Sequence, residues 1–127
     1  MSNMKNNFKI LRSYCNGEII IDPNNDKLVG AIFVGDTKDK GFISNLEVMP
    51  KYRKHGYGSL LLKDAINKYN GIDLTVRKTN SNAIRLYKKF NFVCIKFTDC
   101  ETSPFYWMKL KSKLTKDDKI MEVSKNE

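Results

Sequence analysis

The chain has few of the residues on which metal and nucleophile chemistry most often depend. It contains one histidine, His55, and three cysteines, Cys15, Cys94 and Cys100. Three cysteines cannot all pair within one chain, and Cys94 and Cys100 lack the two-residue spacing and histidine partners of a zinc site. A cysteine nucleophile would have only His55 as its base. The sequence therefore predicts free thiols, no metal, and no cysteine-histidine enzyme.

Long hydrophobic runs are also absent. No run approaches the roughly 18 apolar residues of a membrane-spanning helix, and residues 1–7, MSNMKNN, lack the hydrophobic segment of a secretory signal. We therefore expect a cytoplasmic protein with no membrane partner. The hydrophobic content of 41% suffices for one packed core. We assign a single domain to residues 1–110 and a lysine-rich tail, mobile or forming a short surface helix, to residues 111–127.

Positive charge dominates, because 23 lysines and arginines outnumber 14 acidic residues and give a formal net charge of +9. Such a surface steers acidic partners or keeps the domain in solution. A basic nucleic-acid-binding domain is one alternative, but it rests on charge alone. No aromatic RNA-binding motif, helix-turn-helix pattern or finger spacing accompanies the charge, so we do not expect a nucleic-acid partner.

The order of strand and helix signals predicts a mixed α/β domain. Polar turns at residues 22–26 and 36–41 separate strands over residues 18–22, 27–35 and 42–49. A one-sided apolar pattern predicts a helix over residues 59–69, which Asn70-Gly71 ends. There follow a predicted strand over 72–78, a helix capped by Asn80 or Ser81 that runs to about Lys89, and a hairpin of strands over 92–97 and 105–110.

The stretch from residue 46 to residue 62, LEVMPKYRKHGYGSLLL, carries the strongest functional signal. Pro50 cannot donate to a sheet and so ends the strand after Val48, while Gly56 and Gly58 supply the backbone freedom of a tight strand-to-helix turn. The following helix offers unpaired amides and a positive dipole end to an anion. This pattern predicts a phosphate-binding turn.

Two blocks of the sequence resemble the GNAT superfamily of acyl-CoA N-acyltransferases over residues 27–110. Arg53-x-x-Gly56-x-Gly58 resembles the turn with which that family holds the CoA pyrophosphate. Residues 76–92, VRKTNSNAIRLYKKFNF, resemble its later strand-asparagine-helix block. Asn91 replaces the family's usual glycine, and asparagine tolerates the left-handed conformation needed there.

The resemblance implies a GNAT-like fold, with a central, mostly antiparallel twisted sheet flanked by helices. GNAT domains place two helices after their first strand, and residues 1–26 leave little room for them. We therefore expect a reduced N-terminal helical region, an open acceptor wall and an exposed thioester channel. Either a second subunit of a homodimer completes the acceptor site or the acceptor is large.

The resemblance also implies acetyl-CoA as co-substrate and a set of site residues. Tyr87 matches the tyrosine that protonates the leaving thiolate, and we take Glu47 as the candidate general base. Thr75 stands where several relatives carry a carboxylate, so a base assignment cannot be carried over from them. Asp73 and Glu101 are weaker alternatives to Glu47. The expected cofactor-binding residues are Val48, Arg53, Lys54, His55, Gly56, Tyr57, Gly58, Ser59 and Asn80.

The expected activity is an N-acetyltransferase that moves an acetyl group from acetyl-CoA to a primary amine by direct attack in a ternary complex. The acceptor is a small molecule, a peptide or a protein. The alternative is a non-catalytic acyl-CoA-binding or protein-interaction module on the same fold.

Overall fold

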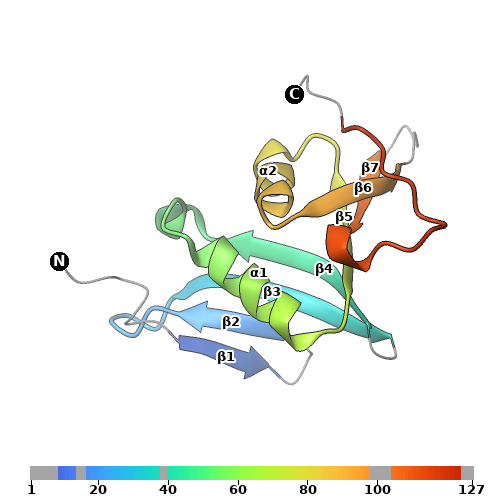
Figure 1. Ribbon diagram of the computed structural model, residues 1–127. Coiled ribbons are helices and arrows are strands. Elements are labelled where there is room, and N and C mark those ends of the chain that lie inside the picture. Colours follow the sequence, from blue (N-terminus) through green and yellow to red (C-terminus); the bar gives the residue numbers. More distant parts are fainter. Residues whose placement is uncertain (1–8, 14–16, 38–39, 98–103, 124–127) are drawn as a thin grey trace.

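The computed structural model describes residues 9–13, 17–37, 40–97 and 104–123 (Figure 1). The strands of these residues form one seven-stranded sheet in the order β1-β2-β3-β4-β5-β7-β6. Neighbouring strands are antiparallel except β4 and β5, which are parallel. This confirms the mixed α/β class. The elements are β1 (Lys9–Ser13), β2 (Gly17–Ile21), β3 (Leu28–Thr37), β4 (Lys40–Val48), α1 (Tyr57–Lys68), β5 (Ile72–Arg77), α2 (Ser81–Lys89), β6 (Phe92–Phe97) and β7 (Phe105–Leu110), with 3₁₀ helices at Pro50–Tyr52 and Lys111–Lys113.

The parallel pair β4–β5 joins two halves of the sheet through a short seam. Only Gly41–Ile43 of β4 pairs with Ile72–Leu74 of β5. Parallel strands need a crossover connection, and α1 supplies it between them. Beyond Ile43 and Leu74 the two strands separate, as Figure 1 shows for the upper end of β5. The separation leaves an opening in the middle of the sheet.

A bulge at Ser44 marks the start of this opening. Phe33 of β3 pairs with Asn45, whereas Val34 pairs with Ile43, so Ser44 is the extra residue on β4. The Ser44 hydroxyl donates to the Phe33 carbonyl at 3.2 Å, which holds the bulge against β3. A bulge increases local twist and bends its strand. β4 therefore stays paired with β3 while it turns away from β5.

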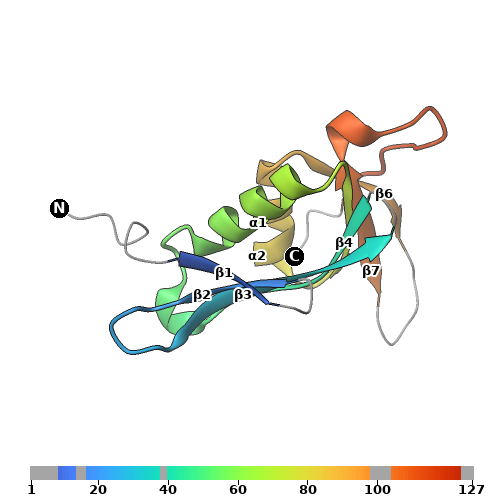
Figure 2. The ribbon, with the colours of Figure 1, turned by 90° about the horizontal axis from the view of Figure 1, so that it is seen from below.

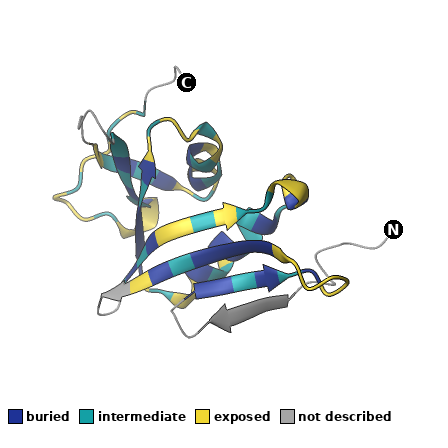
Figure 3. Cartoon of the chain, turned by 180° about the vertical axis from the view of Figure 1, so that it is seen from behind, coloured by how far each residue is buried: buried dark blue, intermediate teal, exposed yellow. Residues whose placement is uncertain are grey.

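Helix α1 covers one face of the first half of the sheet (Figure 2). Its inward residues Leu61, Leu62 and Ala65 are at most 1% exposed and belong to the same core cluster as Ile32 and Ile43. Each fully buried leucine contributes roughly 1.5–3 kcal/mol to stability. No helix of the described chain covers the opposite face of β2, β3 and β4, and the view from behind shows exposed positions along β4 there (Figure 3).

The reduced N-terminal helical region is confirmed. Strands β2 and β3 are joined by a tight turn in which the Asp22 amide donates to the Lys27 carbonyl at 2.9 Å. Within the described part of residues 9–48, every element is a strand. Strand β1, which the sequence did not predict, pairs with β2 and extends the sheet on this side.

The C-terminal segment, for which we expected a mobile tail or a short surface helix, begins with a short helix. Residues 111–113 form a 3₁₀ helix, and the Met121 amide donates to the Cys94 carbonyl at 2.8 Å. Met121 and Val123 pack against the core. Hydrophobic contacts spaced too widely to give a periodic signal therefore hold this segment along β6.

Candidate functional site

The connection from β4 to α1 is a basic loop with two left-handed residues. Strand β4 ends at Val48, two residues before Pro50, as predicted. Lys54 has φ of 67° and Gly56 has φ of 89°. The Arg53 Nε donates to the Val48 carbonyl at 2.8 Å, so the arginine closes the loop back onto the strand end. The remaining guanidinium donors of Arg53 can still face a ligand.

Helix α1 begins with its first amides uncapped by any side chain. Its N-cap is Gly56, and no side chain of the described residues makes a capping hydrogen bond to the first turn, which carries no acidic residue. The helix starts at Tyr57, earlier than the predicted Ser59, so Gly58 lies within the first turn rather than in the loop. A Cβ on Gly58 would lie 3.4 Å from Leu86 Cδ2, an ordinary contact. Free N–H groups at a helix N-terminus form an anion-binding site.

A groove of 660 Å³ runs along this loop and the start of α2; we call it the loop groove. It brings together every residue that the sequence predicted to bind a cofactor, except His55. His55 is exposed, with its ring centroid 6.3 Å from that of Tyr57. The lining residues are Asn45, Leu46, Glu47, Val48, Tyr52, Arg53, Lys54, Gly56, Tyr57, Gly58, Ser59, Asn80, Asn82, Ala83, Leu86 and Tyr87.

A buried polar contact supports the loop from below. The Tyr52 hydroxyl donates to Asp22 Oδ2 at 2.8 Å, which ties the loop to the turn between β2 and β3. Hydrogen bonds from the Asn24 amide and the Tyr52 hydroxyl lower the pKa of Asp22. Tyr57 is 1% exposed, and burial raises its pKa. Tyr57 therefore belongs largely to the core beneath the loop.

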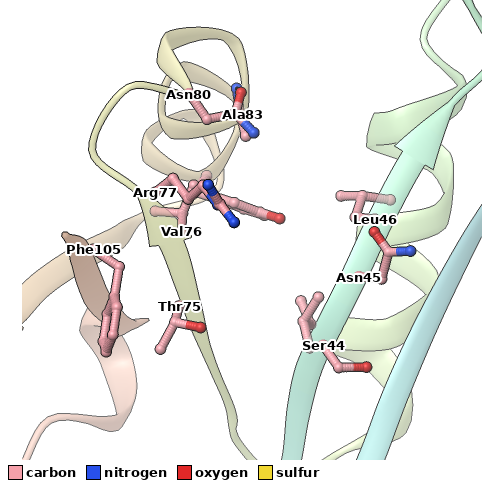
Figure 4. Close-up of a pocket in the computed structure, with 11 residues that line it drawn as sticks. Ser44, Asn45, Leu46, Thr75, Val76, Arg77, Asn80, Ala83 and Phe105 are labelled. Carbon is pink, nitrogen blue, oxygen red and sulfur yellow. The ribbon is translucent and has the colours of Figure 1, made fainter. Parts of the chain in front are cut away.

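A second cavity, of 330 Å³, occupies the opening between β4 and β5; we call it the wedge cavity. Figure 4 shows Ser44, Asn45 and Leu46 on one side and Thr75, Val76 and Arg77 on the other. Asn80, the N-cap of α2, and Ala83 of α2 lie at its end. Ile43, Tyr87 and Phe105 complete the lining. The wedge cavity and the loop groove share Asn45, Leu46, Asn80, Ala83 and Tyr87. Molecules that occupied the two spaces would therefore meet at these residues.

Tyr87 lies at this junction as a protonated phenol. It is 4% exposed and packs edge-on against Phe92, with ring centroids 5.8 Å apart. Burial raises its pKa to about 12. Because a buried phenolate lacks compensating charge, the hydroxyl keeps its proton throughout the neutral range. Tyr87 can therefore donate a proton to a group at the junction.

Asn80 both caps α2 and faces the two cavities. Its Oδ1 accepts a hydrogen bond from the Ala83 amide at 3.2 Å, which confirms the predicted cap. The side-chain NH₂ remains as a donor toward the groove. At the other end of α2, Asn91 has φ of 67°, the left-handed conformation predicted for it.

Comparison with protein families agrees with this arrangement. The model of the acetyltransferase (GNAT) family matches residues 2–92. The chain belongs to the GNAT acetyltransferase family. The match begins before residue 27, where the sequence motifs had placed the start of the resemblance, and so includes β1 and β2.

Individual GNAT relatives include one curated protein and many solved structures. The N-alpha-acetyltransferase of Sulfolobus acidocaldarius is 44% identical over 59 residues, 42% of this chain and 35% of the relative, so the match spans about a third of that relative's length. The ribosomal-protein-S18-alanine N-acetyltransferase of Escherichia coli shares the fold, with a TM-score of 0.66 at 20% identity over 91% of this chain and 76% of that one. Arabidopsis thaliana Naa50, solved with the bisubstrate analogue CoA-Ac-MVNAL, gives a TM-score of 0.60 at 29% identity over 75% and 72% of the two chains.

The carboxylates considered as general base lie in different surroundings. Glu47 is exposed on β4 and lines the loop groove. Asp73 is 4% exposed, forms an ion pair with Lys40 at 2.9 Å and accepts a hydrogen bond from Trp107 Nε1 at 3.0 Å. These contacts indicate a structural role for Asp73. Glu101 lies outside the described residues, as do Cys15 and Cys100, whereas Cys94 is a buried free thiol.

Several lining residues were not predicted from the sequence, among them Asn45, Arg77 and Ala83. Asn45 could have been found, because side chains two apart on a strand share a face and Glu47 was already a candidate. The place of Arg77 in the cavity lining could not have been predicted, since it depends on where β5 separates from β4. Among the described residues, no group of three or more His, Cys, Asp or Glu is placed to hold a metal ion, and no helix is long and apolar enough to cross a membrane.

Proposed function

We propose that this GNAT protein transfers the acetyl group of acetyl-CoA to a primary amine while both molecules are bound. The observation that carries the proposal is that the loop groove and the wedge cavity meet at Tyr87. The amine nitrogen bonds to the thioester carbonyl carbon, the carbon–sulfur bond breaks, and the departing thiolate takes the Tyr87 proton. Glu47, directly or through water, takes the proton that the amine loses.

The loop groove supplies what the phosphates of the co-substrate need. Arg53 and Lys54 provide positive charge, and the uncapped amides at the start of α1 provide hydrogen-bond donors. The pantetheine arm would then follow Val48 and the Asn80 amide toward Tyr87. His55 is an exposed residue of the loop, and its role as a phosphate contact stays a prediction.

Strand β4 supplies the groups that polarise the thioester. Past Ile43, the backbone groups of β4 that point toward β5 have no partner on that strand. Exposed backbone N–H groups aimed at a carbonyl stabilise the negative charge that develops on its oxygen. The Ser44 bulge therefore contributes to the reaction by keeping the two strands apart.

The proposed acceptor is the amino terminus of a peptide or protein. Two relatives point this way, the N-alpha-acetyltransferase of Sulfolobus acidocaldarius and Naa50 with its peptide-bearing analogue. The absence of helices from the described part of residues 9–48 leaves the acceptor side open to an extended chain. A second subunit that completes this side stays a prediction, which light scattering of the purified protein would check.

Calorimetric titration with acetyl-CoA, CoA and dephospho-CoA tests the cofactor side. We expect stoichiometric binding that weakens when the 3′-phosphate is missing. Arg53→Gln should raise the Kd for acetyl-CoA about tenfold or more, because a charge-assisted hydrogen bond contributes about 1.5–3 kcal/mol. Lys63→Gln removes the same charge from the exposed side of α1, outside the groove, and should leave the Kd unchanged.

Turnover separates the enzyme from the non-catalytic module. With acetyl-CoA and a panel of unblocked peptides, mass spectrometry should show a gain of one acetyl group at the amino terminus. Tight binding of acetyl-CoA without acetylation of any peptide or small amine would instead favour the binding module. Absence of acetyl-CoA binding would overturn both.

A further inference from the structure

The wedge cavity carries a single charged side chain among the described residues that line it, and that side chain is Arg77. The other polar side chains, those of Ser44, Asn45, Thr75, Asn80 and Tyr87, carry neutral hydroxyls and amides. No aspartate or glutamate of the described chain lines this cavity. The lining of the wedge cavity therefore contributes one positive charge and no negative charge.

Arg77 is placed to meet a ligand. It is the last residue of β5, it is exposed, and Figure 4 shows its guanidinium extending into the space between β5 and β4. None of the ion pairs and side-chain hydrogen bonds within the described chain involves this guanidinium. Asp73, on the same strand face, is about 13 Å away along the strand and is already paired with Lys40 and Trp107.

We propose that Arg77 selects acceptors that carry a carboxylate close to the reacting amine. Within the proposed function, on which this inference rests, such an acceptor is a peptide amino terminus with aspartate or glutamate as its first or second residue. A guanidinium binds a carboxylate through two parallel hydrogen bonds, which fixes direction as well as position. With the carboxylate held at the end of β5, the amine of the same peptide can reach the thioester beside Tyr87.

The same arrangement disfavours acceptors rich in positive charge. A polyamine or a lysine-rich peptide would bring further ammonium groups next to Arg77, with no carboxylate in the described lining to receive them. Like charges in a partly desolvated cavity repel, and the repulsion is greater than in bulk water. Discrimination should therefore run from acidic through neutral to basic second residues.

The test compares peptides of one sequence that differ only at the second residue, Ser-Glu, Ser-Gln and Ser-Lys. For the parent protein with saturating acetyl-CoA, we expect kcat/KM for the Ser-Glu peptide to exceed that for the Ser-Gln peptide at least about tenfold. The reason is that only the glutamate can form a charge-assisted bidentate pair with Arg77. Arg77→Gln should bring the Ser-Glu value down to that of the Ser-Gln peptide. Arg77→Lys keeps the positive charge but lacks the planar guanidinium that forms two parallel hydrogen bonds, so it should retain part of the preference for the Ser-Glu peptide.

The matched control is Arg85→Gln. Arg85 is an exposed arginine on α2 that bonds Asn82 and lines neither cavity, so this variant loses the same charge elsewhere. It should keep the full preference for the Ser-Glu peptide. Equal kcat/KM values for the Ser-Glu and Ser-Gln peptides in the parent would overturn the proposal, as would a preference that survives Arg77→Gln.

A binding measurement separates this inference from the proposed function. Calorimetry of the same peptides with the CoA-saturated protein needs no turnover. If no peptide is acetylated but the Ser-Glu peptide still binds more tightly than the Ser-Gln peptide, and Arg77→Gln removes that difference, the proposed function fails and the carboxylate site stands. Equal binding of the two peptides would contradict the proposed carboxylate site at Arg77.

Discussion

Replacing Tyr87 by phenylalanine removes a proton from the junction of the two cavities and little else. The ring keeps its edge-on contact with Phe92, and within the described chain the hydroxyl makes no hydrogen bond that would be lost. We expect the free energy of unfolding at neutral pH to change by less than about 1 kcal/mol. The Kd for acetyl-CoA should change less than about twofold, whereas kcat should fall by about 10²–10⁴, the usual contribution of a general acid.

The raised pKa of Tyr87 gives this prediction a pH dependence. A tyrosine with the ordinary pKa of about 10 is half ionised at pH 10, whereas one with a pKa of about 12 is about 1% ionised. Tyr87 therefore stays a proton donor across an assay from pH 6 to pH 10. Loss of its proton should produce no alkaline decline in kcat within that range.

The assay follows acetylated peptide by mass spectrometry from pH 6 to pH 10 for the parent, Tyr87→Phe and the control Tyr69→Phe, whose ring lies outside both cavities. A kcat for Tyr87→Phe equal to that of the parent would refute the role of the hydroxyl. An alkaline decline near pH 9–10 in the parent that disappears in Tyr87→Phe would refute the raised pKa instead.

Stability at high pH checks the same burial without substrate. The folded state holds the Tyr87 proton about two pH units higher than the unfolded chain does, so stability is fully present below about pH 10 and is lost as the pH rises toward 12. Relative to Tyr87→Phe, the parent should lose up to about 3 kcal/mol over that interval. Three other predictions concern residues Lys68, Asn80 and Cys94. Lys68→Met leaves the buried Glu18 without its ion-pair partner and should lower the free energy of unfolding by about 2–3 kcal/mol in urea titrations, with partial recovery when Glu18→Gln is added. Asn80→Asp keeps the oxygen that caps α2 but removes the NH₂ donor, so it should weaken acetyl-CoA binding about tenfold and leave the stability nearly unchanged. Asn80→Ala removes both groups, so it should weaken binding and also lower the free energy of unfolding by about 1 kcal/mol. In a protein whose other two cysteines are replaced by serine, Cys94 should react with a thiol reagent only as the chain unfolds, because it is 1% exposed and burial raises its pKa.

Much of the loop groove could be predicted because local sequence determines it. Pro50 ends β4, and Gly56 takes a left-handed conformation that few other residues adopt. Asn80 caps α2 with its own side chain, and Asn91 takes the left-handed position after that helix. Each of these features depends on residues within one turn of the chain, so a single sequence carries the signal.

The wedge cavity could not be predicted in the same way because pairing between distant strands forms it. The Ser44 bulge exists only relative to Phe33, and the end of the seam at Ile43 depends on Leu74. Lys54 takes a left-handed conformation that its residue type does not indicate.

The short seam between β4 and β5 also makes ligand occupancy a property of the whole fold. Strands β1 to β4 precede strands β5 to β7 in the sequence. Within the described residues, direct strand pairing joins the two sets only at Gly41–Ile43 and Ile72–Leu74. A ligand that contacts both β4 and α2 spans that boundary and acts as an additional link between the two sets. At a ligand concentration of 100 times Kd, the native state gains about 2.7 kcal/mol. The thermal unfolding midpoint should then rise with acetyl-CoA concentration, so a melting experiment can rank co-substrates before any acceptor is known.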